Sequence, residues 1–243
     1  MCSFFLKYFP EDEHYPDRPL PQEFSFRASR IFIKKHSCFF STSQYFSQFK
    51  TIYIWHEYIQ QKALDEYFCD GLFISPVVGP KKKNDFKSEL ILMAYQRMIE
   101  LNLYPKNRVL VGAFFSFSRY AGPREAVFTA ICRKNYGCSH FIVGRDHTGI
   151  NNFYPKEANI RFFEGVGDIG IKPIFFDEAA YCDQCEAMRL SCEHPSSCIH
   201  PISGTLIRDF LDRNENPPGW MMREEIANML IEMIKNKEEI FIS

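Results

Sequence analysis

The stretch that decides the fold is His140-Phe-Ile-Val-Gly-Arg-Asp-His-Thr-Gly149. Its apolar residues 141–143 predict a buried strand, which ends at Gly144 and is followed at once by polar side chains. In open α/β sheets, ligands bind at the carboxyl ends of strands. Gly144 permits close approach of a phosphate to the backbone, and the guanidinium of Arg145 offers a fork of donors to it. The stretch therefore predicts a phosphate site, although these residues taken alone are also compatible with a polar turn.

Outward from this stretch, strands and helices alternate along the chain. Short apolar runs predict strands, and apolar residues at helical spacing predict helices. The expected strands are 38–40, 71–78, 108–115, 140–143 and 173–176. The expected helices are 25–35, 55–67, 88–103, 123–136, 203–214 and 223–237. Such alternation indicates an α/β fold with a parallel sheet and helices on its faces.

The chain is expected to divide into three parts. Residues 1–24 contain four prolines and mixed charge, which predicts an extended arm without a core of its own. Residues 25–170 carry the alternating pattern and predict one Rossmann-like nucleotide-binding domain. Residues 171–243 contain a group of cysteines and histidines followed by two helices, and they predict a small metal-bearing, helical region.

The composition excludes several classes of function. With 46% hydrophobic residues among 243, the chain has enough apolar material for a sizeable core. A net charge of −1 does not produce the positive electrostatic field that would attract nucleic acid or an anionic membrane. No apolar run approaches the roughly 18 residues of a membrane span, and the charged start does not resemble a signal peptide. We therefore expect no nucleic-acid partner, no membrane partner and a cytoplasmic location.

The cysteines favour a metal site. Their number, nine, is odd and several stand near histidines, which favours a reducing compartment over a disulfide framework. Cys182-x-x-Cys185 followed by Cys192-x-His194 provides ligands that can close a tetrahedral zinc site. Four protein ligands leave no open position, so we expect Zn²⁺ to be structural. Reduced free cysteines are the alternative, and Cys198 and His200 are further candidate ligands.

A second stretch, Arg119-Tyr-Ala-Gly-Pro-Arg-Glu-Ala126, lies upstream of the strand. Together the two stretches resemble the catalytic domain of the ATP sulfurylase (sulfate adenylyltransferase) family. That family binds its nucleotide through the first four residues of a Gly-Arg-Asp-His-Ala-Gly segment, and its Ala contacts sulfate. Thr148 stands at the Ala position and would alter the acceptor pocket. The resemblance makes Thr148 and Arg119 substrate-binding residues and assigns the nucleotide to Gly144, Arg145, Asp146 and His147.

The family also has a His-x-x-His-Glu segment whose two imidazoles contact the ATP phosphates. Here His56 matches the second His, and Tyr53 stands at the first. A helix N-terminus already favours anions, and His or Tyr adds directed donors. We expect His56, helped by Tyr53, to stabilise charge at the bridge between the α- and β-phosphates. A helix cap or a surface group is the alternative interpretation of this His.

The family's Gln-Thr-Arg-Asn-Pro segment is poorly matched. It falls on Ser41-Thr-Ser-Gln44, where Thr42 is the one matching residue. The missing Arg is the largest departure, because a bidentate guanidinium is the natural holder of a tetrahedral oxyanion. Lys50 offers a point charge in its place.

The last matching segment is His200-Pro-Ile-Ser-Gly-Thr205, with Arg208 one turn further on. It resembles an Ile-Ser-Gly-Thr-x-x-Arg segment of the family. Backbone donors at the start of this helix and the Arg208 side chain along the same face suit a phosphate. The resemblance therefore adds four nucleotide-binding residues: Ser203, Gly204, Thr205 and Arg208. A plain capped helix is the alternative interpretation of this segment.

The resemblance covers about residues 25–243 and implies both fold and activity. The implied fold is a Rossmann-like parallel sheet of the nucleotidyltransferase type with a small zinc-bearing C-terminal helical region. The implied reaction moves AMP from ATP to sulfate and releases pyrophosphate, with Mg²⁺ accompanying the nucleotide. The implied catalytic residues are His56, Tyr53, Thr42 and Arg145.

The departures from the family leave two other functions open. One is nucleotidyl transfer to a different small oxyanion or to a phosphorylated acceptor, because the sulfate-holding Gln and Arg are lost. The other is a nucleotide-binding homologue without catalysis. The family's separate β-rich N-terminal domain is expected to be absent, and a homodimer is left open, since family members commonly self-associate.

Overall fold

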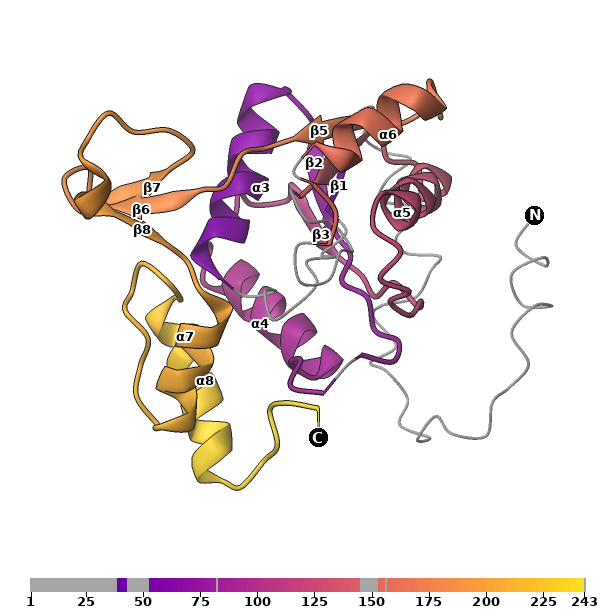
Figure 1. Ribbon diagram of the computed structural model, residues 1–243. Coiled ribbons are helices and arrows are strands. Elements are labelled where there is room, and N and C mark those ends of the chain that lie inside the picture. Colours follow the sequence, from indigo (N-terminus) through magenta and orange to yellow (C-terminus); the bar gives the residue numbers. More distant parts are fainter. Residues whose placement is uncertain (1–38, 43–52, 82, 145–152, 156, 243) are drawn as a thin grey trace, which may run out of the picture.

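The computed structural model describes residues 39–42, 53–81, 83–144, 153–155 and 157–242. Five parallel strands form a sheet in the order β3-β2-β1-β4-β5 (Figure 1). The strands are β1 (Phe39–Thr42), β2 (Gly71–Ile74), β3 (Val109–Val111), β4 (His140–Val143) and β5 (Lys172–Phe175). Helices lie on both faces: α3 (Ile54–Glu66), α4 (Ser88–Glu100), α5 (Pro123–Asn135) and α6 (Ala158–Val166). This strand order, with helices between the strands, is that of the doubly wound α/β fold.

Two separate cores cover the two faces of the sheet. Side chains along a strand point alternately to opposite faces. Leu72 and Ile74 accordingly belong to one core with residues of α3 and α4, whereas Phe73 belongs to the other with residues of α5 and α6. Figure 1 shows these two pairs of helices on opposite sides of the sheet.

The α/β alternation expected from the sequence is confirmed for the described residues, with some shorter elements. The strand at 140–143 has the expected bounds, and the fifth strand is present. The expected strand 71–78 ends at Ile74 because Pro76 has no N–H for the ladder. Beyond it, Val77 forms a single bridge with Phe114, so the expected strand 108–115 is also shorter. The expected arm 1–24 and helix 25–35 lie outside the described residues.

The loops after β2 and β3 continue side by side past the ends of the strands. The N–H of Phe114 donates to the Pro76 carbonyl, and the N–H of Val78 donates to the Phe114 carbonyl, at 2.8 and 3.0 Å. A Cβ on Gly79 would lie 1.8 Å from the Ser116 carbonyl oxygen, so this residue has to be glycine. The two loops are thus held together by their backbones.

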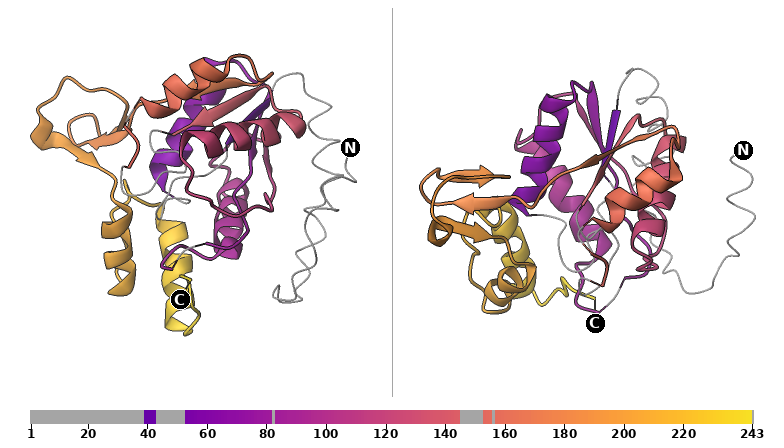
Figure 2. Two further views of the ribbon diagram at one scale, coloured as in Figure 1. Left: turned by 45° about the vertical axis from the view of Figure 1, so that its right-hand side comes forward. Right: turned by 45° about the horizontal axis from the view of Figure 1, so that its top comes forward.

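The C-terminal part adds a second, small sheet and two helices. Its antiparallel strands, in the order β7-β6-β8, are β6 (Ala180–Cys182), β7 (Ala187–Arg189) and β8 (Ile199–Pro201). A 3₁₀ turn, η2 (Ser196–Cys198), precedes β8, and the helices are α7 (Gly204–Asp212) and α8 (Glu224–Lys235). Figure 2 shows the small sheet projecting from the side of the main one. Since β5 pairs with β4, the main sheet extends past residue 170, and the expected domain boundary there stays a prediction.

The described cysteines are mostly free. Six are unbonded thiols, namely Cys132, Cys138, Cys182, Cys185, Cys192 and Cys198, whereas Cys69 is disulfide-bonded. None of the helices in the described ranges is long and apolar enough to cross a bilayer.

A buried carboxylate fixes the loop that leads into α5. Glu125 is 3% exposed and accepts the backbone N–H groups of Arg119 and Ala121 at 3.0 to 3.1 Å. Within this loop Tyr120 and Gly122 have φ of +52° and +55°. A Cβ on Gly122 would lie 2.2 Å from Tyr154 Cε2. Glycine is therefore required at position 122 both by its backbone conformation and by the space around it.

We expect Gly122→Ala to lower the free energy of unfolding by about 2 kcal/mol, because it adds left-handed strain and a clash with Tyr154. Gly165→Ala is the control: its Cβ meets nothing within 4 Å in a helix, so stability should rise by about 0.5 kcal/mol. Urea unfolding of both variants measures the difference. Equal stability of the two variants would contradict the prediction.

Candidate functional site

The carboxyl ends of the parallel strands meet at one edge of the sheet. At this edge the backbone of Thr42 lies between Ile74 of β2 and Ile142 of β4. Gly144 follows β4, and its carbonyl accepts the Asn159 amide at 3.2 Å. The predicted nucleotide-binding residues that follow it lie outside the described residues: Arg145, Asp146, His147 and Thr148. Their roles, and that of Thr42, stay predictions.

The start of α3 places Tyr53 and His56 in a buried position. Tyr53 is the N-cap residue and 1% exposed, and His56 is 5% exposed. Their rings are stacked at 6.0 Å, and His56 also packs on Trp55 at 4.0 Å. Burial raises the pKa of the Tyr53 hydroxyl far above its usual value; the nearby Arg208 guanidinium lowers it and the Asp85 carboxylate raises it further. The phenol is therefore neutral and available as a hydrogen-bond donor.

Arg208 on α7 interacts electrostatically with the start of α3. Arg208 interacts with Tyr53, and its guanidinium also donates to the Gly204 carbonyl and the Thr205 hydroxyl, both at 3.3 Å. Ser203 caps the helix, since its hydroxyl accepts the Leu206 N–H at 3.3 Å. Tyr53 thus lies near both His56 and Arg208, and the Ser203 hydroxyl acts as a helix cap. The nucleotide-binding roles expected for the residues of this helix start stay predictions.

Arg119 lies on a different loop. Its guanidinium donates to the Phe117 carbonyl at 3.2 Å and stacks on the rings of Phe117 and Phe128, at 4.1 and 5.1 Å. It is exposed to solvent. Its role as a substrate-binding residue stays a prediction.

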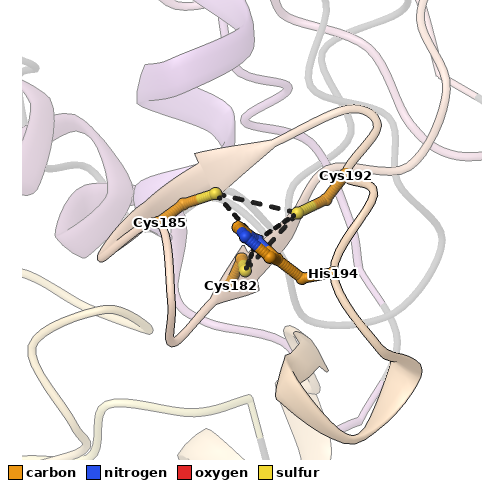
Figure 3. A group of neighbouring side chains, drawn as sticks. All are labelled: Cys182, Cys185, Cys192 and His194. Atoms are coloured by element: carbon orange, nitrogen blue, oxygen red, sulfur yellow. Dashed lines mark hydrogen bonds between the residues drawn. The ribbon is translucent and has the colours of Figure 1, made fainter.

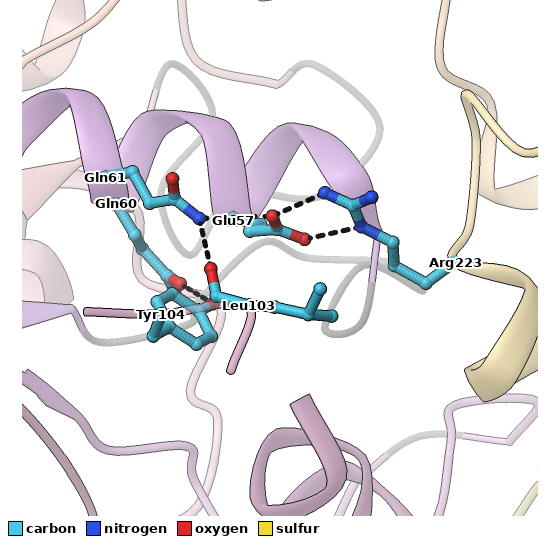
Figure 4. A network of polar contacts seen from close by, with 6 residues as sticks. All are labelled: Glu57, Gln60, Gln61, Leu103, Tyr104 and Arg223. Atoms are coloured by element: carbon cyan, nitrogen blue, oxygen red, sulfur yellow. Dashed lines mark hydrogen bonds and ion pairs between the residues drawn. The ribbon is translucent and has the colours of Figure 1, made fainter. Parts of the chain in front are cut away.

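An ion pair anchors the first turn of α3 to α8. Arg223 donates to both oxygens of Glu57, at 2.7 and 3.0 Å (Figure 4). The Glu57 side chain is 5% exposed, and Gln61 adds a third bond to it at 3.1 Å. The Ile54 N–H, at the start of the same helix, donates to the Met221 carbonyl at 3.2 Å. These contacts fix the helix start that carries Tyr53 and His56.

The four cysteine and histidine residues predicted to bind metal lie together (Figure 3). Their ligand atoms all lie within 4.8 Å of one another: Cys182, Cys185, Cys192 and His194. The Cys192 sulfur lies 3.5 and 3.7 Å from the sulfurs of Cys182 and Cys185, and the three sulfurs lie 3.1 to 3.4 Å from Nδ1 of the imidazole. Ligands around tetrahedral Zn²⁺ are separated by about 3.8 Å, so this group fits a metal of that size.

The charges around the group also suit a metal cation. Burial raises the pKa of the Cys182 thiol, but hydrogen bonds from the Cys185 backbone and from the neighbouring thiols and imidazole lower it to about 6. A hydrogen bond with the Cys185 sulfur raises the pKa of Arg189, so a guanidinium stands beside that sulfur. His200 instead bonds Asp183 at 2.7 Å. His200 and Cys198, the further candidates, are therefore outside this group of ligands.

Aromatic contacts connect the small sheet to the start of α8. Tyr181 of β6 stacks on Trp220 at 5.3 Å with an interplanar angle of 11°, and His200 of β8 packs on the same indole at 5.6 Å. Trp220 directly precedes Met221, the residue bonded to the start of α3. The small sheet thus supports the segment that positions Tyr53 and His56.

Sequence reasoning missed two of the residues around this site. Arg223 and Asp85 interact with Glu57, Tyr53 and Arg208 only through the tertiary fold. No local spacing identifies such partners. A buried acidic residue at the start of an expected helix was the one available signal that a distant cation is needed.

A doubly wound parallel sheet, with donors gathered at its carboxyl edge and an appended Cys₃His group, defines an α/β protein with a nucleotidyltransferase-like fold. Comparison with known families is more specific. A family model described as ATP-sulfurylase matches residues 46–233. The chain therefore belongs to the ATP-sulfurylase family, and the resemblance found in the sequence is confirmed.

Curated relatives agree with this assignment. The sulfate adenylyltransferase of Thermococcus onnurineus is 44% identical over 192 residues, which cover 78% of this chain and 49% of that protein. The sulfate adenylyltransferase of Ignicoccus hospitalis is 46% identical over 178 residues, which cover 72% of this chain and 46% of that protein. The chain thus spans about half the length of these relatives.

A solved structure shows the same fold. A hexameric APS kinase from Thiobacillus denitrificans has a TM-score of 0.65 and covers 89% of this chain and 41% of that chain. At 16% sequence identity this likeness concerns the fold alone.

The Glu57–Arg223 pair leads to a stability prediction. We expect Arg223→Met to lower the free energy of unfolding by about 2 to 3 kcal/mol, because it leaves a buried carboxylate without its cation. The double variant Glu57→Gln with Arg223→Met should recover part of this loss, since the uncompensated charge is gone. Urea unfolding of the three proteins tests it. A double variant less stable than the single one would contradict the explanation.

Proposed function

We infer that this chain catalyses the adenylyl transfer of its family. An oxygen of sulfate attacks the α-phosphorus of ATP, the bond from that phosphorus to the bridging oxygen breaks, and pyrophosphate leaves. The family match across residues 46–233, with relatives named sulfate adenylyltransferase, carries this proposal. The arrangement at the carboxyl edge supports it, because neutral and cationic donors gather where the fold binds ligands.

The proposed catalytic contribution of the chain is positioning and charge stabilisation, which phosphoryl-type transfers generally require. The buried Tyr53 and His56 donate hydrogen bonds to the bridge where negative charge develops. The Arg208 guanidinium faces the same region and holds a phosphate oxygen. Arg145 and His147, outside the described residues, hold the rest of the triphosphate. The Glu57–Arg223 pair positions the helix start without touching substrate.

The other proposed attributes follow from the family or the sequence. Mg²⁺ accompanies the nucleotide and offsets part of the charge on its phosphates. A cytoplasmic location and self-association as a homodimer stay predictions, as does the division into arm, nucleotide-binding domain and C-terminal region.

Pyrophosphate release from MgATP, with and without sulfate, tests the proposed function. We expect sulfate to stimulate release by the wild-type chain, and Arg208→Ala to lower kcat/KM about 100-fold by removing a charged donor. Arg145→Ala should lower it similarly. Arg213→Ala is the matched control at the C-cap of the same helix, since its guanidinium pairs with the exposed Glu215 at 3.0 Å. Absence of sulfate-stimulated release from folded wild-type protein would contradict the proposal.

For the Cys₃His group we propose a structural Zn²⁺, held by all four ligands with no position left for substrate. The ion would supply binding energy that ties the β6–β8 sheet together and, through Trp220, supports α8.

We expect the purified chain to contain one equivalent of zinc by elemental analysis. Cys192→Ser should lose the metal and lower the melting temperature, because binding energy at such a site is folding energy. Cys198→Ser is the control, since its sulfur lies 4.0 Å from the Ser197 hydroxyl and outside the group. Equal loss of zinc from both variants would show that the ligand set is different.

A further inference from the structure

One carboxylate connects three parts of the site that are far apart in the sequence. Asp85 interacts electrostatically with Tyr53 at the start of α3, with Arg208 on α7 and with Lys81 in the loop after β2. Tyr53, Arg208 and Lys81 therefore all lie near the same carboxylate. Lys81 has no part in the function derived so far, and no local sequence pattern marks it.

The loop that carries Lys81 is fixed at both ends. Gly79 abuts the Ser116 backbone, as described above. After the lysine, Asn84 and Asp85 exchange backbone hydrogen bonds with Ile242, both at 2.8 Å. The position of Lys81 is thus set by the surrounding backbone rather than by its own side chain.

The Lys81 side chain is half-buried, and no ion pair joins it to a carboxylate among the described residues. Among the described residues its hydrogen bond goes to the Phe86 carbonyl at 3.4 Å. Burial lowers the pKa of Lys81 to about 8, although Asp85 and Glu89 act to raise it. A half-buried ammonium with one long hydrogen bond has donors left for a ligand.

The Tyr53 hydroxyl independently indicates a ligand. The side chain is 1% exposed, and its oxygen has no hydrogen-bond partner within the part of the chain that the structure describes. Burying a hydroxyl without a partner costs free energy. Lys81 and Arg208 stand beside this neutral hydroxyl as two cations. Asp85 acts on both, Glu89 acts on Lys81, and Asp209 and Asp212 act on Arg208. Because Lys81, Arg208 and Tyr53 are all hydrogen-bond donors, they suit an acceptor with several oxygens, such as an oxyanion.

We propose that Lys81 binds a tetrahedral oxyanion together with Arg208 and the Tyr53 hydroxyl, while Asp85 holds the two cations in place. Within the proposed function, on which this inference rests, that oxyanion is either sulfate or the pyrophosphate part of the nucleotide. A lysine here would add positive charge to a chain that lacks the family's sulfate-holding Arg.

Binding measured directly tests the inference without relying on turnover. Titration calorimetry with sulfate, and separately with pyrophosphate, would compare the wild-type chain with Lys81→Met. Loss of one charged hydrogen bond predicts weaker binding by about 10- to 100-fold for at least one of the anions. Lys81→Arg should keep most of the affinity. The matched control is Lys83→Met, an exposed lysine of the same loop, which should bind like the wild type.

The sulfate and pyrophosphate titrations together identify which oxyanion Lys81 binds. A loss confined to sulfate assigns Lys81 to the acceptor, and a loss confined to pyrophosphate assigns it to the nucleotide. Unchanged binding of both anions by a folded Lys81→Met variant would overturn the inference, and so would the absence of any anion binding by the wild type. Thermal melts of each variant show that it is folded.

The pH dependence provides a second readout. Lysine is charged below its pKa, so wild-type affinity for the anion that depends on Lys81 should fall as the pH rises through about 8. In Lys81→Arg this fall should disappear, because a guanidinium keeps its charge. Lysine-dependent binding without pyrophosphate release from ATP would reject the proposed function and keep this inference. Sulfate-stimulated turnover with unchanged KM values in Lys81→Met would support the proposed function and reject this inference.

Discussion

The site depends first on the ion pair between Glu57 and Arg223. A carboxylate buried this deeply is strongly destabilising without a cation, so α8 has to dock where α3 begins. That docking brings the Met221 carbonyl to the Ile54 N–H and fixes the turn that carries Tyr53 and His56. It also explains why α7 and α8 share one apolar core with α3 and α4. The C-terminal helices are therefore part of the machinery at the sheet edge.

The small sheet contributes to the same arrangement from further away. Its Cys₃His group joins residues of the hairpin to the segment before β8, and β8 leads into the start of α7. Tyr181 and His200 then support the indole of Trp220 beside α8. Both helices that face the start of α3 are thus supported by one local cluster. A cluster that contacts no substrate in this arrangement can still determine how well the donors at the sheet edge are aligned.

Local sequence patterns predicted the features that depend on neighbouring residues. The strand 140–143, the alternation of elements and the Cys₃His spacing all follow from short-range periodicity or ligand spacing. The bounds of β2 and β3 could not be predicted in this way. Pro76 ends the ladder of hydrogen bonds between these strands, and only Val77 and Phe114 bridge beyond it. Asp85, Lys81 and Arg223 were missed because their partners are brought close by the tertiary fold alone. The small sheet was missed because its three-residue strands carry too little pattern.

Gly79 has a consequence for how this site can diverge. The backbone of the loop after β2 touches the backbone of the loop after β3 there, with no side chain between them to absorb a shift. Closely packed backbones transmit displacement instead of damping it. An insertion or a bulkier residue in the phenylalanine-rich segment after β3 would therefore relocate the Lys81 ammonium. Variation in a loop distant from the reacting atoms can in this way retune which anion the chain prefers.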